Sequence, residues 1–138
     1  MLKRFFYITY VILLVYIVWL LPSEVKPHAT VNLVPLQTIR LYITAFIHGY
    51  VPIYIVIGNL IGNILLFVPI GIIFYHHLRH MGIGFILFIS MYIPAYIEVV
   101  QLLLHLAGYG TRSADVDDVL LNMIGIWIGY LATSFVLK

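Results

Sequence analysis

Residues 52–75 read PIYIVIGNLIGNILLFVPIGIIFY and contain no charged side chain. A helix of this length would be about 36 Å long, which exceeds the roughly 30 Å of hydrocarbon in a bilayer. The two amide side chains in the stretch, Asn59 and Asn63, are four residues apart and therefore share one face of such a helix. The stretch predicts a membrane-spanning helix that carries one polar stripe.

Three other stretches have the length and apolar character of spans, namely residues 5–21, 83–106 and 116–137. The chain is 64% hydrophobic and 9% charged, whereas a soluble protein has about 25% charged residues. We predict one all-α membrane domain over residues 1–138 with four transmembrane helices. The first span could instead be a cleaved signal peptide, but no small-residue cleavage site follows it, so we predict a retained anchor.

Residues 34–51 form the ambiguous segment, because polar side chains interrupt their apolar pattern. Arg40 would cost at least about 2.5 kcal/mol at the centre of a bilayer. The apolar residues from Leu36 onward follow the i, i+3, i+4 spacing of a helix that lies in the membrane interface. We predict an external interfacial or re-entrant helix between spans one and two, with a fifth span as the alternative.

The basic residues predict the orientation of the chain in the cell membrane. Lysine and arginine are enriched on the cytoplasmic side of membrane proteins. Four of them lie at the start of the first span, in the link between spans two and three, and at the C-terminus. The other three lie on the opposite side of the membrane if the spans alternate. The larger number predicts that both termini are cytoplasmic. The four are Lys3, Arg4, Arg79 and Lys138, and the three are Lys26, Arg40 and Arg112.

Composition also excludes several functions. The chain has no cysteine, so it has neither disulfides nor a thiolate metal site or nucleophile. Its formal net charge of +2 is too small to indicate a nucleic-acid partner. The apolar composition instead predicts a membrane lipid as the partner of the chain.

Polar residues inside the last two predicted spans also lie on single helical faces. The spacing i, i+3, i+7 occurs in both spans, and it places three side chains on one face of a helix. Asp117 does not share the face of its neighbours. The residues with this spacing are Glu98, Gln101 and His105 in the third span and Asp115, Asp118 and Asn122 in the fourth.

The stripes should meet at one depth, because alternating spans would place all of them in the outer half of the bilayer. The loop with Arg112 and Ser113 would lie directly above them. Polar groups in hydrocarbon are costly and usually pair with one another or line a path, and an isolated carboxylate such as Glu98 needs a proton or a cation, for which Arg112 is the obvious candidate. We predict that these residues form a shared functional site. The alternative is a purely structural hydrogen-bond network in which Asp115 caps the fourth span.

Four stretches in order along the chain form a recognisable set: NLVP at 32–35 with Thr38 and Ile39, GNLIGNILLFVPIG at 58–71, Ile97-Glu98 with Gln101, and TRSADVDDVLLNMIG at 111–125. Together they resemble the VanZ-like membrane protein family, whose namesake is linked to resistance to the glycopeptide teicoplanin. The last stretch is the most specific, although Thr111 stands where the family pattern more often has glycine. The resemblance implies one shared polar site and adds Asn32 to it; the implied members are Asn32, Asn59, Asn63, Glu98, Gln101, Arg112, Asp115, Asp118 and Asn122, and Ser113 lies beside them.

Three functions compete for such a site. The first is binding or remodelling of a lipid-linked or peptide-bearing envelope component, with Arg112 recognising a phosphate or carboxylate. The second is an intramembrane hydrolase or transferase that acts on a phosphate-containing lipid-linked substrate, with Glu98, Asp115 and Asp118 as acid, base or ligands of a divalent cation. The third is a structural scaffold or assembly partner. A homodimer is also plausible, because Gly58 and Gly62 resemble a small-xxx-small contact.

Overall fold

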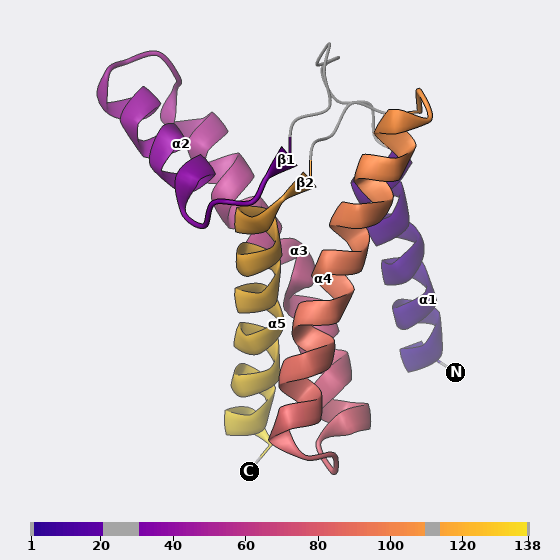
Figure 1. Ribbon diagram of the computed structural model, residues 1–138. Helices are drawn as coiled ribbons and strands as arrows, with labels where there is room; N and C mark the ends of the chain where they lie inside the picture. The colour runs from indigo at the N-terminus through magenta and orange to yellow at the C-terminus, as the bar shows by residue number, and fades with distance from the viewer. Residues whose placement is uncertain (1, 21–30, 110–113, 138) are drawn as a thin grey trace.

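The computed structural model describes residues 2–20, 31–109 and 114–137, which form an all-α protein with one minimal strand pair (Figure 1). The first helix ends in a π-helical turn, η1, and the two strands, β1 and β2, have two residues each. The elements in chain order are α1 (Leu2–Val15), η1 (Tyr16–Leu20), β1 (Val31–Asn32), α2 (Gln37–Ile47), α3 (Ile53–Leu78), α4 (Ile83–Leu106), β2 (Ala114–Asp115) and α5 (Val116–Val136).

Three helices, α3, α4 and α5, are long and apolar enough to cross a membrane. They coincide with the predicted second, third and fourth spans, although α3 continues to Leu78, past the predicted end at residue 75. The first predicted span corresponds to the shorter apolar helix Arg4–Leu20. The chain is therefore a multi-pass membrane protein with three candidate spans and a shorter apolar helix at its start.

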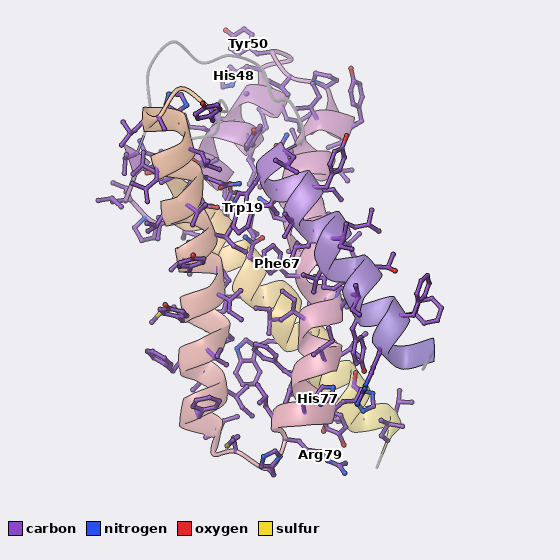
Figure 2. All side chains as sticks on the ribbon, turned by 90° about the vertical axis from the view of Figure 1, so that its right-hand side faces the viewer. Trp19, His48, Tyr50, Phe67, His77 and Arg79 are labelled. Carbon is purple, nitrogen blue, oxygen red and sulfur yellow. The ribbon has the colours of Figure 1, made fainter. Side chains whose placement is uncertain are left out.

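Helix α2 is a short element and does not cross the bundle. It has eleven residues, none of them buried, and is about 16 Å long, so the alternative of a fifth span is wrong. It lies at the end of the bundle where the two strands pair and α3 begins (Figure 1). The opposite end carries His77 and Arg79 at the close of α3, whereas His48 and Tyr50 mark the α2 end (Figure 2).

Helices α3 and α5 run side by side in the same direction and pack backbone against backbone (Figure 1). Each of three glycines in the contact has a carbonyl oxygen of the other helix where a Cβ atom would stand: Gly125 faces Ile64, Gly129 faces Val68 and Gly71 faces Ile126. Small residues allow this approach in membranes, where packing rather than water drives helix association. The small-xxx-small pair Gly58 and Gly62 has no such contact, because among the described residues nothing lies within 4 Å of a Cβ built on either glycine.

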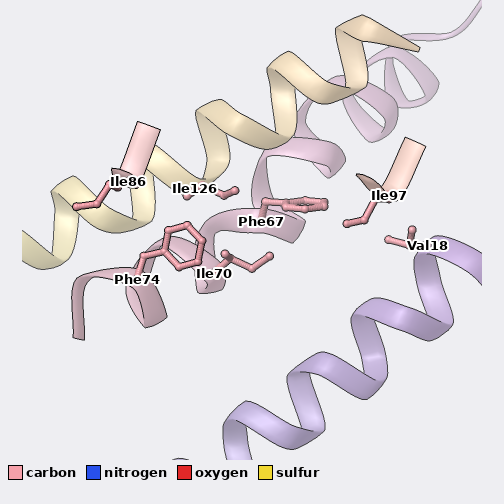
Figure 3. Packing of buried hydrophobic residues seen from close by; sticks show 7 residues of the cluster. All are labelled: Val18, Phe67, Ile70, Phe74, Ile86, Ile97 and Ile126. Atoms are coloured by element: carbon pink, nitrogen blue, oxygen red, sulfur yellow. The ribbon is translucent and has the colours of Figure 1, made fainter. Parts of the chain in front are cut away.

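The apolar core joins η1, α3, α4 and α5 (Figure 3). Phe67 and Ile126, two of its most buried members, each follow an asparagine of the polar stripes by four residues, so on α3 and α5 the core begins one helical turn beyond Asn63 and Asn122. The seven buried members are Val18, Phe67, Ile70, Phe74, Ile86, Ile97 and Ile126.

We expect Gly129→Ala to lower the free energy of unfolding by roughly 1–3 kcal/mol, because the added methyl group meets the Val68 carbonyl and the two helices must separate. The matched control is Gly62→Ala, where the described space is open and alanine gains helix propensity, so stability should stay equal or rise. Thermal unfolding of the purified variants measures both. Equal unfolding temperatures for the two variants would contradict this account of the α3–α5 contact.

Candidate functional site

The site is organised by the pairing of β1 with β2, which brings together two segments that are far apart in the sequence. Val31 pairs with Ala114 and Asn32 pairs with Asp115 in a parallel register. Asp115 is also the N-cap of α5, with an extended backbone and a carboxylate that accepts a hydrogen bond from the backbone N–H of Asp117 at 2.9 Å. Aspartate is a favoured N-cap because its carboxylate pairs with free N–H groups of the first turn. The predicted capping role of Asp115 is confirmed.

Asp115 joins four segments through hydrogen bonds. Its carboxylate accepts from the Asn32 side-chain amide at 2.9 Å and from the Thr38 hydroxyl, in addition to the Asp117 N–H. Its own backbone N–H donates to a carboxylate oxygen of Glu98 at 2.9 Å. The buried Asp115 side chain thus has three donors, which is a framework role rather than that of a free acid or base.

Asp117 has a role that the sequence analysis did not assign. Its carboxylate, with an exposed fraction of 0%, accepts the backbone N–H groups of Leu36, Thr38 and Ile39, the last two at 2.8 and 3.1 Å. Leu36, the N-cap of α2, has a φ of 65° and offers no side-chain cap. A carboxylate at a helix N-terminus pairs with the free N–H groups and with the positive end of the helix dipole. Asp117 therefore anchors α2 on the first turn of α5.

The stripes of α3 and α5 meet through Asn63, whose side-chain amide donates to the Asp118 carboxylate at 2.6 Å. Asn59 extends the α3 stripe by one turn toward the α2 end of the bundle. It is exposed, and its amide donates to the Ile55 carbonyl at 2.8 Å. Asn122 extends the α5 stripe by one turn toward the apolar core and is 3% exposed. Its side-chain oxygen has no hydrogen-bond partner among the described residues.

Helix α4 contributes a second buried acid and amide. Glu98 is 6% exposed and is held by the Asp115 backbone, as described above. Gln101 donates at 3.0 Å to the Val18 carbonyl of η1, which ties α4 to the first helix. His105, in the last turn of α4, is half-buried, and its Nδ1 atom has no partner in the described part of the chain. Arg112 and Ser113 lie outside the described residues, so the pairing of Glu98 with Arg112 stays a prediction.

Tyr42 is a second residue that the sequence analysis did not assign to the site. It follows Thr38 by four residues on α2 and so shares the face that contacts Asp115. Partial burial and the nearby carboxylates of Asp118 and Asp115 raise the pKa of the Tyr42 phenol above its ordinary value. Tyr42 is therefore a neutral hydrogen-bond donor at the edge of the carboxylates.

Metal chemistry has limited support in this arrangement. Within residues 2–20, 31–109 and 114–137, no group of three or more His, Asp or Glu side chains is arranged to hold a metal ion. The oxygens of Asp115 and Asp117 already accept hydrogen bonds from three donors each. A divalent cation stays a prediction that would depend on Glu98 and Asp118.

The described chain is thus an all-α, multi-pass membrane protein that has a hydrogen-bonded polar cluster at one end of an apolar bundle. The model of the VanZ/LLP1 family matches residues 6–137, and the chain belongs to this family. Within the family, VanZ is associated with teicoplanin resistance. No curated protein and no solved structure matches the chain. The resemblance found in the sequence motifs is confirmed.

We expect Asp117→Asn to loosen α2 without unfolding the bundle, because an asparagine keeps one acceptor oxygen and loses the charge at the α2 N-terminus. The loss should be about 1–2 kcal/mol, the usual effect of removing a helix cap. Hydrogen exchange of the Thr38 and Ile39 amides should accelerate by about 5- to 30-fold. The control is Gln37→Ala, an exposed change in the same turn. Unchanged protection in Asp117→Asn would show that the cap does not hold α2.

Proposed function

We propose that this protein binds or remodels a lipid-linked or peptide-bearing component of the cell envelope, in a polar site that opens to the outer leaflet. The observation that carries the proposal is the convergence of polar groups from β1, α2, α3, α4 and α5 at one end of the bundle. Six polar or charged residues are buried in the described chain, and Ser90 alone among them lies outside this cluster and its stripes. Buried polar residues in a membrane usually mark a site.

The side of the cluster toward α2 and α3 supports access from the lipid. Asn59 extends the α3 stripe and is exposed, and Tyr42 is only half-buried. Helix α2 buries none of its own residues, although it is held at its N-terminus by Asp117. A ligand with acyl chains would keep the chains against the apolar outer surface and place its polar group beside Asp118.

We further propose that the first helix is the fourth span and that both termini are cytoplasmic. Helix α1 and η1 have 14 and 5 residues and together reach about 28 Å, close to the thickness of the hydrocarbon layer. Contacts along its length hold this helix against the bundle: the Tyr7 ring lies 5.8 Å from that of His77, and the Tyr10 hydroxyl donates to the Leu66 carbonyl at 2.7 Å. This topology puts Arg79 in the cytoplasm and the polar cluster in the outer leaflet.

A second candidate function, an intramembrane hydrolase or transferase for a phosphate-containing lipid, is favoured by one observation. Glu98 and Asp118 bring two carboxylates from different helices to the same end of the bundle, and each is oriented by a neutral donor. Two carboxylates can divide the roles of acid and base or bind a divalent cation. The scaffold alternative is supported by Asp115 and Asp117, whose carboxylates have framework contacts.

We expect Glu98→Gln and Asp118→Asn each to abolish protection against teicoplanin in a sensitive host in which the wild-type protein provides it. Both changes keep the size and a hydrogen-bond acceptor, so the protein should still insert, while the charge of the site is lost. His76→Ala, an exposed change at the far end of α3, is the control. The minimum inhibitory concentration and the amount of protein in the membrane are measured together. Full protection by both variants at normal protein levels would contradict the proposal.

Lipid mass spectrometry of the same cells separates the binder from the enzyme. An enzyme should change the amount of a lipid-linked species in wild-type cells relative to Glu98→Gln cells, and it should process a lipid extract after purification. A binder should retain a lipid through purification without converting it. Sensitivity of the conversion to a chelator would indicate a divalent cation at Glu98 and Asp118.

A further inference from the structure

The start of α1 and the end of α3 meet at the end of the bundle opposite the polar cluster, where His77 and Arg79 lie (Figure 2). The Tyr7 ring of α1 contacts the His77 ring of α3 edge-on, with 5.8 Å between the ring centres. Further along α1, the Tyr10 hydroxyl donates to the Leu66 carbonyl at 2.7 Å. The residue numbers rise on α1 and fall on α3 through these two contacts, so the helices are antiparallel. The first turns of α1 therefore lie beside the last turns of α3.

Two arginines extend this contact toward the membrane surface. Arg4 is three residues before Tyr7, and Arg79 is two residues after His77. Residues three apart share a helical face, so Arg4 is on the face of α1 that carries Tyr7. Both arginine side chains are exposed. The antiparallel arrangement thus brings two guanidinium groups from different helices to one end of the bundle.

The Arg79 guanidinium is held by a stack of aromatic rings. Its central carbon lies 5.5 Å from the centre of the Tyr75 ring, which is a cation–π distance. The Tyr75 side chain is itself buried, and its ring contacts the Tyr130 ring of α5 edge-on at 5.6 Å. A guanidinium that rests on a fixed ring loses less conformational freedom on binding a ligand than one on a free side chain. Arg79 is therefore preorganised, although it is exposed.

The charge at this end of the bundle has no acidic counterpart within the described residues. The four acidic residues of the described chain all belong to the polar cluster at the other end; they are Glu98, Asp115, Asp117 and Asp118. Arginines beside a membrane surface are attracted to anionic lipids. A guanidinium also fits a phosphate group, because it donates two parallel N–H bonds to the phosphate oxygens. The charge and the donor geometry are therefore complementary to an anionic headgroup.

We propose that the surface formed by Arg4, Tyr7, Tyr75, His77 and Arg79 binds the headgroup of an anionic phospholipid. The lipid phosphate lies against the two guanidinium groups, and its acyl chains lie along the exposed apolar side chains of the bundle. Phosphatidylcholine fits less well, because its quaternary ammonium would meet the arginines. In the topology proposed above, the site faces the cytoplasmic leaflet, whose surface is negatively charged. This lipid site is separate from the proposed function, whose residues lie at the other end of the bundle.

The test uses the full chain in nanodiscs with equal mole fractions of dioleoyl phosphatidylglycerol and dioleoyl phosphatidylcholine. Native mass spectrometry counts the lipids of each kind that stay bound when the protein leaves the disc. We expect phosphatidylglycerol to be enriched by about 25-fold, because each of two arginines near the surface contributes a factor of about five. Arg4→Gln and Arg79→Gln should each lower the enrichment by about fivefold.

Two further variants separate the site from general charge. Arg40→Gln is the matched control, because it removes the same charge from an exposed side chain of α2 at the other end of the bundle, and it should leave the enrichment unchanged. Arg79→Lys keeps the charge but loses the planar group that lies on Tyr75, so the enrichment should fall by about twofold. The unfolding temperature of each variant is measured in detergent with and without phosphatidylglycerol. The lipid should raise this temperature more for the wild type and Arg40→Gln than for Arg4→Gln or Arg79→Gln, even where a variant is less stable without it.

Three results would overturn the lipid site. Retention of both lipids in proportion to their mole fractions by the wild type would show that the surface does not select an anionic headgroup. An equal loss of enrichment in Arg40→Gln and Arg79→Gln would show that only the net charge of the chain matters. Full enrichment in Arg79→Lys would contradict the preorganised contact on Tyr75.

Discussion

The structure depends on the hydrogen bonds around Asp115. This one residue pairs with β1 through its backbone, caps α5 through its carboxylate, accepts from Asn32 and Thr38, and donates to Glu98. A membrane offers no water to replace a lost partner, so each of these groups must be paired within the protein. Because the donors come from segments up to 83 residues away in the sequence, pairing them fixes how those segments meet. The apolar helices supply the bundle, and Asp115 sets the arrangement at its polar end.

The first turn of α5 distributes three carboxylates to three neighbours. The Asp115 carboxylate accepts from Asn32 on β1 and Thr38 on α2. The Asp117 carboxylate accepts from the start of α2, and the Asp118 carboxylate accepts from Asn63 on α3. Successive helical residues are about 100° apart, so adjacent acids necessarily point to different partners. Three acids at a helix N-terminus also interact favourably with its dipole, which reduces the cost of placing their charges together. This geometry explains how α5 can begin with three closely spaced aspartates whose carboxylates are all paired.

The sequence predicted those features that depend on local periodicity. Hydropathy and length predicted α3, α4 and α5, and helical spacing grouped Glu98 with Gln101 and Asp118 with Asn122. It did not predict the role of Asp117, because the helix that Asp117 caps lies 79 residues earlier in the chain and no local pattern links the two. The glycine pairs likewise show that spacing in the sequence does not predict which residues make a long-range contact. The spacing of Gly58 and Gly62 is also the spacing of Gly125 and Gly129, and the packing of α5 on α3 determines that the second pair is used within the chain. The first pair is left without an assigned contact, and a homodimer through it stays a prediction.

The polar residues of the site differ in how much hydrogen-bonding capacity they have left. Asp115 and Asp117 accept from three donors each, so a ligand that approached them would have to break bonds on which β1 and α2 depend. Asn122 lies one helical turn beyond Asp118 on α5, and its buried side-chain oxygen has no hydrogen-bond partner in the described part of the chain. A site that must stay assembled in hydrocarbon while it exchanges a ligand needs both kinds of residue: one set with every bond made inside the protein, and another whose bonds are completed by the ligand. A residue in the family motif is therefore not necessarily one that contacts a ligand. The number of hydrogen bonds that its side chain can still make distinguishes a framework residue from a ligand-binding one.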